Sequence, residues 1–348
     1  SQLCFSSGEM FRLIESYITD NFGEKGKFRF VIAPDDTPYA CTCPSCTAIG
    51  NTEKNATPAV TELILRLSQR FPRHFFFTTS YLTTQQVTDK QLPPNAGVIV
   101  SAINFPLRRI DGKDAKEKAF AGQLEQWKNV TKNIYIWDYI NNFDDYLTPM
   151  PILKIARQRL QFFKQHGASG IFFNGSGYSY SSFDEMRTFV LSALLINPEL
   201  SVDNLTASFF NQEYPAAKKW LYDYYTDLEN GTQSGKRLGI YAGIRESEKA
   251  YLTPEKFIKF YDEMNDFVSN AKGKERKKLH ELQTALSYTR MEMGREHSFD
   301  AYGYAKRNGK SLQPIPQVQE WLTQLKEHKA FTGMEYYNRS EEHTSELQ

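Results

Sequence analysis

The chain has 348 residues, of which 40% are hydrophobic and 14% aromatic, so it can bury a large core and is expected to be globular. Its 42 lysines and arginines nearly balance its 41 aspartates and glutamates, and the one dense basic run, "KGKERKKLH" from Lys272, contains no aromatic residue. This balance argues against a nucleic-acid or membrane-surface partner, and no apolar stretch reaches the roughly 18 to 20 residues that span a bilayer.

Short runs rich in aromatic and β-branched residues, bounded by Gly, Pro and Asn, recur through the first half of the chain. Their near-continuous apolar character is typical of parallel strands that are covered on both faces. The runs that predict strands are 27–33, 74–81, 96–103, 133–140 and 169–175.

Helical patterns separate most of these runs, with apolar residues recurring at helical spacing. The patterns cover residues 57–71, 115–130 and 150–167. The first of them opens with Thr57 as the predicted N-cap, followed by Pro58 at the first helical position.

Strands that alternate with helices require right-handed crossovers and a parallel sheet. An open doubly wound sheet is expected to carry a glycine-rich phosphate-binding turn, and the sequence has neither G-x-G-x-x-G nor G-x-x-x-x-G-K-[ST]. A (β/α)8 barrel needs no such turn. We therefore predict an α/β fold, a partial (β/α)8 TIM-type barrel with about five parallel strands, and we expect further barrel strands before Ser1.

After Phe183 the strand patterns stop and helical patterns continue. Ser182 and Glu185 fit a capping box at the start of the first of these helices, and the longest pattern covers 275–306. The predicted domains are a partial barrel over 1–197, a helical bundle over 198–330 and a disordered tail over 331–348. The last ten residues, 339–348, resemble a translated sequencing adapter, and we exclude them from the fold.

Side chains at the carboxyl ends of parallel barrel strands converge on one pocket, so the strand ends give the candidate site. The candidates for catalysis are Asp35, Asp36 and Asp138. The candidates for substrate binding are Tyr39, Tyr81, Asn104, Trp137, Tyr139, Asn141, Asn142 and Asn174. These residue types suit a sugar site. Aromatic rings stack on pyranose rings, amides form hydrogen bonds with sugar hydroxyls, and a pair of carboxyl groups can cleave the glycosidic bond.

In the catalytic interpretation, Asp35 or Asp36 has one role and Asp138 has the other, across the mouth of the barrel. A carboxyl separation of about 5 Å would indicate retention of configuration, and roughly 6.5 to 9.5 Å would indicate inversion. In the alternative, Asp36 caps the turn before Pro38 and Asp138 pairs with a cation in the barrel wall, since aspartates also cap turns. The sequence leaves both interpretations open.

Three of the four cysteines, Cys41, Cys43 and Cys46, follow the first strand with the spacing C-x-C-x2-C, and Cys4 precedes the helix that leads into that strand. Together the four thiols fit a closed structural zinc site. A disulfide between two of them, or free thiols, are the alternatives. In each case we expect the cysteines to fix the loop that carries the first two candidate acids, and we expect no cofactor for catalysis.

Several segments, in order, resemble the DUF4838 family. They are "FRFVIAPDDTPYACTCPSC", "HFFFTTSYLTT", "IYIWDYINNFDDYLTPMP", "HGASGIFFNGSG" and "SALLINPELSVDNLTASFFNQEY". The most specific are the cysteine cluster after an acidic strand end and the W-D-Y-x-x-N-F run. The resemblance covers most of residues 1–230. One departure is "FFNGSG" after the last strand, where related chains often carry a Gln or an acid.

The resemblance implies a glycosidase-type TIM barrel, similar to those of α-glucuronidases and hexosaminidases, in a bacterial protein that degrades or binds a complex glycan. It also implies export to the periplasm or the extracellular space. Three hypotheses follow: a glycoside hydrolase that uses a carboxyl pair, a carbohydrate-binding barrel without turnover, and a zinc-stabilised protein-interaction module. The last predicts a large exposed apolar patch and no convergent acids.

Overall fold

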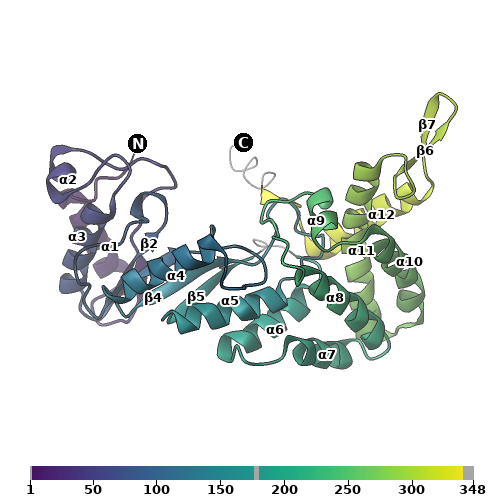
Figure 1. Ribbon diagram of the computed structural model, residues 1–348, viewed down its shortest axis with the longest axis horizontal. Helices are drawn as coiled ribbons and strands as arrows, with labels where there is room; N and C mark the ends of the chain where they lie inside the picture. Colours follow the sequence, from purple (N-terminus) through teal and green to yellow (C-terminus); the bar gives the residue numbers. More distant parts are fainter. Residues whose placement is uncertain (1, 176–179, 340–348) are drawn as a thin grey trace. The chain divides into compact units, whose positions relative to one another are not determined.

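The structure is a computed structural model that describes residues 2–175 and 180–339. The chain divides into two compact units (Figure 1). Unit 1 comprises Ser1–Pro106, Asp111–Tyr139 and Phe162–Phe173, and unit 2 comprises Leu107–Ile110, Ile140–Gln161 and Asn174–Gln348. The domain boundary expected between residues 197 and 198 stays a prediction.

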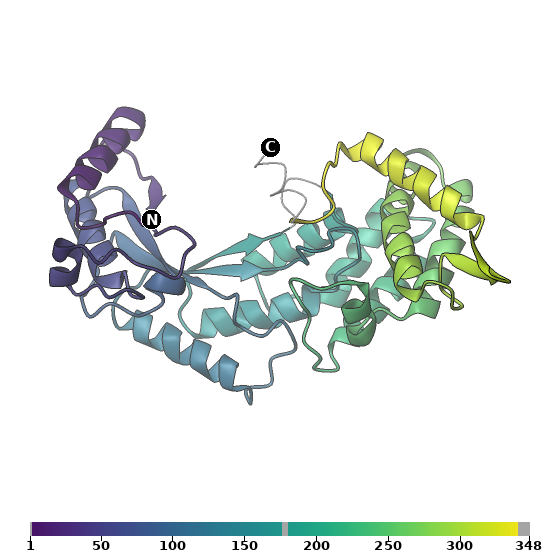
Figure 2. The same ribbon diagram turned by 90° about the horizontal axis from the view of Figure 1, so that it is seen from above.

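Five parallel strands form a curled half-barrel sheet, which can be followed in Figure 2. They are β1 (Arg29–Val31), β2 (Phe75–Ser80), β3 (Ala96–Ser101), β4 (Ile134–Tyr139) and β5 (Gly170–Asn174). The strands lie side by side in sequence order. Each falls within one of the five predicted runs, so the predicted fold class, a partial parallel barrel followed by a helical region, is confirmed.

Helices precede and connect the strands. They are α1 (Gly8–Phe22), α2 (Pro44–Ile49), α3 (Thr57–Arg70), the 3₁₀ helix η1 (Leu82–Thr84), α4 (Ala115–Lys128) and α5 (Leu153–Gln165). The helix α3 packs against β2 and β3, and α4 packs against β4.

The register of the strands gives the sheet two different faces. On the helix-covered face, Phe76, Val98 and Ile134 are all 0% exposed, and the last two are partners across β3 and β4. Successive side chains of a strand point to opposite faces. The other face, which we name the open face, carries Val31, Phe77, Ile99, Tyr135, Trp137 and Phe172. It is partly accessible, because Val31 is 51% exposed and Phe172 is 53% exposed.

The start of α3 differs from the prediction. Its N-cap is Ala56, and Thr57 is the first helical residue. The side chain of Asn55 accepts a hydrogen bond from the Thr57 N–H at 3.0 Å. The side chain of Asn51 accepts one from the Ala59 N–H at 3.0 Å. The prediction that Thr57 caps the helix is wrong, because two asparagine side chains from the preceding loop satisfy the free N–H groups of the first turn.

Unit 2 is mainly helical. Its elements after the sheet are α6 (Asp184–Ile196), α7 (Val202–Glu213), α8 (Lys218–Thr232), α9 (Ile244–Ala250), α10 (Pro254–Asn270), α11 (Gly273–His297), β6 (Ala305–Asn308), β7 (Ser311–Pro314) and α12 (Gln317–Thr332). Among the described residues, no helix is both long and apolar enough to cross a bilayer.

The capping box predicted for α6 does not form. The N-cap is Phe183, with φ of 62°, and not Ser182. The Ser182 hydroxyl is turned to the Leu147 carbonyl, to which it donates a hydrogen bond, and the Glu185 carboxylate forms an ion pair with Lys278. The local pattern assigned both side chains to the start of the helix. In the structure, Ser182 and Glu185 bind other elements of unit 2 instead.

The predicted end of the helix over 275–306 is also wrong. The helix α11 stops at His297, and the antiparallel strands β6 and β7 follow. The two-residue turn between them is Gly309 and Lys310, and Gly309 has φ of 60°. A glycine at the first position of a two-residue hairpin turn is a sequence signal, because the turns that close such hairpins require positive φ there. This signal was present in the sequence and outweighs the helical spacing around it.

Part of the segment that the sequence assigns to a disordered tail makes contacts in unit 2. Met334 is 0% exposed. The Tyr337 carbonyl accepts a hydrogen bond from the Tyr146 N–H at 3.0 Å, and the Arg339 N–H donates to the Phe143 carbonyl at 2.8 Å. Residues 340–348, which hold most of the adapter-like sequence, lie outside the described residues.

The buried His328 of α12 generates a pH prediction. It is 0% exposed, and burial lowers its pKa to about 4. An unfolded histidine has a pKa of about 6.5, so the unfolded state binds the additional proton between these two values. The stability that neutral His328 contributes is therefore present above pH of about 6.5 and is lost as the pH falls to about 4.

We expect His328→Gln to weaken this acid sensitivity. Between pH 7 and 4.5, the free energy of unfolding should fall by about 2 kcal/mol less in the variant than in the native chain. Urea denaturation of both proteins at the two pH values measures the difference. Parallel pH dependence in the two proteins would show that the native His328 is not held neutral.

Candidate functional site

The loop after β1, residues 34–40, carries the first two predicted acids, and we name it the acid loop. Asp35 and Asp36 are both exposed. The Asp35 carbonyl accepts hydrogen bonds from the Thr37 N–H at 2.7 Å and from the Gln2 side-chain amide at 3.1 Å. Within the described chain no hydrogen bond or ion pair reaches either carboxylate, so the backbone of the loop is held while its acids face solvent.

The third predicted acid, Asp138, has a different environment. It is 0% exposed, and its Oδ1 accepts a hydrogen bond from the Tyr139 backbone N–H at 2.8 Å. Along β4, buried Ile134, Ile136 and Asp138 alternate with partly exposed residues. Asp138 therefore lies on the helix-covered face, whereas its neighbour Trp137 lies on the open face.

Aromatic rings from different strands meet on the open face. Tyr135 stacks on Phe77, with ring centroids 4.8 Å apart. Trp137 meets Phe172 edge to face at 5.0 Å. The Trp137 Nε1–H is buried and has no acceptor among the described residues. We name Tyr135, Trp137 and Phe172 the aromatic strip, since they present ring surface along β4 and β5.

The other predicted binding residues of unit 1 are accessible to different degrees. The Tyr139 hydroxyl lies 3.5 Å from the Ser101 hydroxyl. Tyr81, at the end of β2, is half-buried, and Asn104, after β3, is exposed. Tyr39 of the acid loop is 56% exposed. All of them follow or end strands of the parallel sheet, whose carboxyl ends lie at one edge.

The predicted amides of unit 2 are engaged in packing. Both amide atoms of Asn142 bond the backbone of Ala242, its Nδ2 donating to the carbonyl at 2.7 Å and its Oδ1 accepting from the N–H at 3.1 Å. The Oδ1 of Asn141 accepts from Arg187 at 3.2 Å, and Asn141 is 2% exposed. Asn174, the last residue of β5, is half-buried. The backbone of Ala242 therefore engages both amide atoms of Asn142, whereas the Nδ2 of Asn141 is buried with no hydrogen-bond partner among the described residues.

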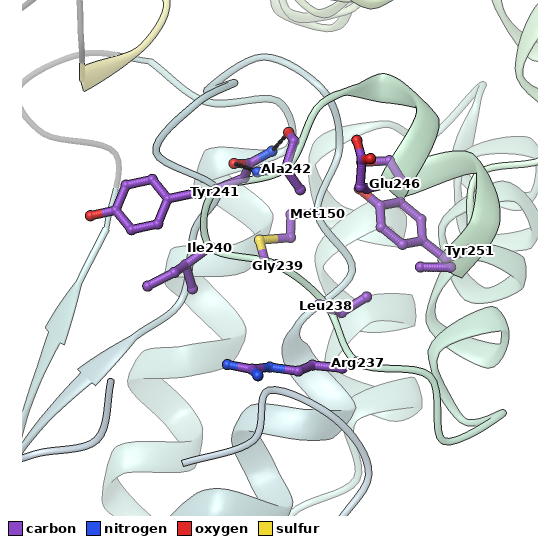
Figure 3. Close-up of a pocket in the computed structure, with 12 residues that line it drawn as sticks. Met150, Arg237, Leu238, Gly239, Ile240, Tyr241, Ala242, Glu246 and Tyr251 are labelled. Atoms are coloured by element: carbon purple, nitrogen blue, oxygen red, sulfur yellow. Dashed lines mark hydrogen bonds between the residues drawn. The ribbon is translucent and has the colours of Figure 1, made fainter. Parts of the chain in front are cut away.

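Unit 2 also contains a pocket that the sequence analysis missed (Figure 3). Its volume is about 410 Å³, and its lining includes Met150, Arg237, Tyr241, Glu246 and Tyr251. In Figure 3, Arg237 and Glu246 extend from opposite ends of the pocket. The glycine-rich segment 235–243 between α8 and α9 indicates a loop. The spacing of its glycines does not indicate that this loop lines a pocket.

The four cysteines form one cluster in unit 1. Their sulfurs all lie within 4.8 Å of one another, and all four are free thiols. The Cys4 sulfur is 3.6 Å from that of Cys43 and 3.8 Å from that of Cys46. A disulfide would need about 2.05 Å. The four-cysteine cluster could hold a structural metal such as zinc, because four thiolates complete a closed tetrahedral site.

Two of the thiols have strongly different acidities. The backbone N–H of Cys46 and the thiol of Cys4 donate to the Cys43 sulfur and lower the pKa of Cys43 to about 6. Burial raises the pKa of Cys46 to about 12. A donor N–H stabilises the thiolate, which is the form that binds metal, whereas burial favours the neutral thiol.

The burial of Asp138 generates a stability prediction. Asp138→Ala should lower the free energy of unfolding by about 1–3 kcal/mol, because the partly buried Tyr139 N–H loses its acceptor. Asp36→Ala is the matched control, and its exposed side chain predicts a change within about 0.5 kcal/mol. Urea denaturation measures both. Equal stability of the two variants would contradict a structural role for Asp138.

Comparison with known proteins supports the resemblance of the sequence segments. No curated protein matches the chain. The model of one family, described as Domain of unknown function (DUF4838), matches residues 1–227. This match spans more than half of the chain and includes the whole parallel sheet, the acid loop and the cysteine cluster. The chain therefore belongs to the DUF4838 family.

Proposed function

We propose that the protein binds a glycan on the open face of its sheet. The observation that carries this proposal is the aromatic strip, in which rings of neighbouring strands present partly exposed surface next to the strand ends. Aromatic rings bind sugars by stacking on the apolar faces of pyranoses, and they lose little conformational entropy when they do so. The strip therefore supplies the apolar part of a saccharide site.

Polar groups at the same edge of the sheet complete such a site. Tyr81, Asn104 and Tyr139 offer hydroxyl and amide groups that read sugar hydroxyls. The acid loop adds two exposed carboxylates. Ligand sites in barrels lie at the carboxyl ends of the strands, where a few polar groups stand beside apolar surface.

Removing one ring from the strip tests the binding proposal. Phe172→Ala and Trp137→Ala should each weaken glycan binding about tenfold or more, because truncating an anchoring ring costs about 1.4 kcal/mol or more. Tyr17→Ala, which removes an exposed ring of α1, is the control and should bind like the native chain. Affinity electrophoresis against a panel of polysaccharides, followed by calorimetry, measures the change. Binding that is absent in the native chain, or unchanged in both variants, would contradict the proposal.

The exposed acids favour glycoside hydrolysis as a second candidate function. Cleavage of a glycosidic bond needs a proton donor and a carboxylate nucleophile or base. Asp35 and Asp36 are accessible for such a role, whereas Asp138 is fully buried and accepts a hydrogen bond from the Tyr139 N–H. A catalytic pair needs accessible carboxyl groups, and Asp138 is not accessible. The pair therefore lies within the acid loop, or it joins one acid of the loop with a residue other than the three predicted acids.

Assays of reducing-sugar release on the bound glycan separate the two functions. If the protein is a hydrolase, Asp35→Asn or Asp36→Asn should lower kcat about 100-fold or more and leave the affinity close to native, because each change removes proton transfer but keeps the shape of the side chain. Asp138→Asn should reduce activity only as far as it reduces stability. Tight binding without any release would identify a carbohydrate-binding protein without turnover.

A further inference from the structure

The cysteine cluster joins parts of unit 1 that are distant in sequence. Cys4 precedes α1, Cys41 lies in the chain after the acid loop, Cys43 is the N-cap of α2, and Cys46 lies in the first turn of α2. Each position is fixed by backbone contacts as well as by sequence. For example, the Cys41 carbonyl accepts a hydrogen bond from the Asn51 side chain at 3.1 Å.

The arrangement of the sulfurs fits a metal better than it fits thiols alone. Four sulfurs bound to one zinc ion at about 2.3 Å lie about 3.8 Å apart in a tetrahedron. The separations of Cys4 from Cys43 and Cys46 are 3.6 and 3.8 Å. Thiol groups are weak hydrogen-bond donors, so their mutual contacts alone give little reason for four of them to converge.

The hydroxyl of Ser6 adds a further contact to the cluster. It lies 3.1 Å from the Cys46 sulfur, 3.4 Å from the Cys4 sulfur and 3.9 Å from the Cys43 sulfur. A hydroxyl donor beside several thiolates offsets their negative charge and orients them, as outer-shell groups do at metal sites. With four thiolates the site is complete and leaves no open position for substrate, so its role is structural.

We propose that the cluster binds one zinc ion and that this ion holds the acid loop in place. The acid loop lies between β1 and Cys41. When the ion binds Cys41, it therefore holds the C-terminal end of the loop in place. The loop has two other ties. The Ala40 N–H donates to the Glu53 carbonyl at 2.7 Å. Gln2, two residues before Cys4, bonds the middle of the loop. The Gln2 amide donates to the Asp35 carbonyl at 3.1 Å and to the Thr37 hydroxyl at 2.6 Å.

Few other interactions hold this part of the chain. Residues 35, 36, 38 and 39 are exposed, and the short helix α2 has only six residues, too few to be stable by itself. Cys46 is 0% exposed and packs in a core with residues of α3, whereas Cys4, Cys41 and Cys43 are only partly buried against that core. Without the ion, residues 34–50 would retain little buried surface, while α3 and the central strands would keep theirs.

Metal analysis and hydrogen exchange on the full chain test the proposal. The native protein should contain one zinc ion per chain, and Cys43→Ser should lose it. Ser45→Ala, an exposed change in the same turn of α2, is the matched control and should keep it. When a chelator strips the native chain, amide exchange should accelerate about tenfold or more in residues 34–50 but not in β2 to β4, and added zinc should reverse the change.

Each other outcome overturns the proposal. Iron in place of zinc, four freely reactive thiols with no metal, or a disulfide seen as a loss of two hydrogens in the intact mass would each exclude the zinc site. Bound zinc whose removal leaves exchange in residues 34–40 unchanged would exclude its role in holding the acid loop. Because these readouts need no glycan, they stand whether or not the proposed function is correct.

Discussion

The alternation of side chains along the parallel strands is the constraint on which the rest of unit 1 depends. Because neighbouring residues of a strand point to opposite faces, β4 sends Ile136 and Asp138 to the helices and Trp137 to the open face. The same register brings Phe77 of β2 against the ring of Tyr135 of β4. One periodicity therefore builds both the core under α3 and α4 and the aromatic strip on the other side.

The two units stabilise their functional groups by different means. In unit 1 the acid loop has little core of its own. The Gln2 hydrogen bonds and the bond from the Ala40 N–H to the Glu53 carbonyl hold it, and the thiol cluster follows it at Cys41. In unit 2 the pocket wall is held by backbone pairing, with Asn142 bonding both backbone groups of Ala242 and the Phe143 N–H bonding the Ile240 carbonyl. With the proposed zinc ion, the first arrangement depends on the metal that the sulfurs bind, whereas the second depends on hydrogen bonds that form on folding.

Local sequence predicted elements well where the local preference and the tertiary contacts agree. All five strands lie within apolar runs bounded by turn residues, because burial on a sheet demands that pattern. Predictions failed where side chains had better partners elsewhere. Ser182 bonds the Leu147 carbonyl and Glu185 pairs with Lys278, so no capping box forms. Gly309 indicates the turn of the β6–β7 hairpin, but the apolar residues at helical spacing before it favoured a longer helix.

For the candidate site, the sequence by itself determined that acids, amides and aromatic residues end the strands of a parallel sheet and that three cysteines follow the first acids. Only the tertiary structure decided which of these residues are buried or engaged in packing and which are accessible. It buries Asp138 beside the helices, occupies Asn141 and Asn142 in packing, and brings Cys4 to the other three thiols. The reason is physical: spacing along a chain fixes which residues end a strand, whereas burial and hydrogen-bond partners depend on segments that are far away in sequence.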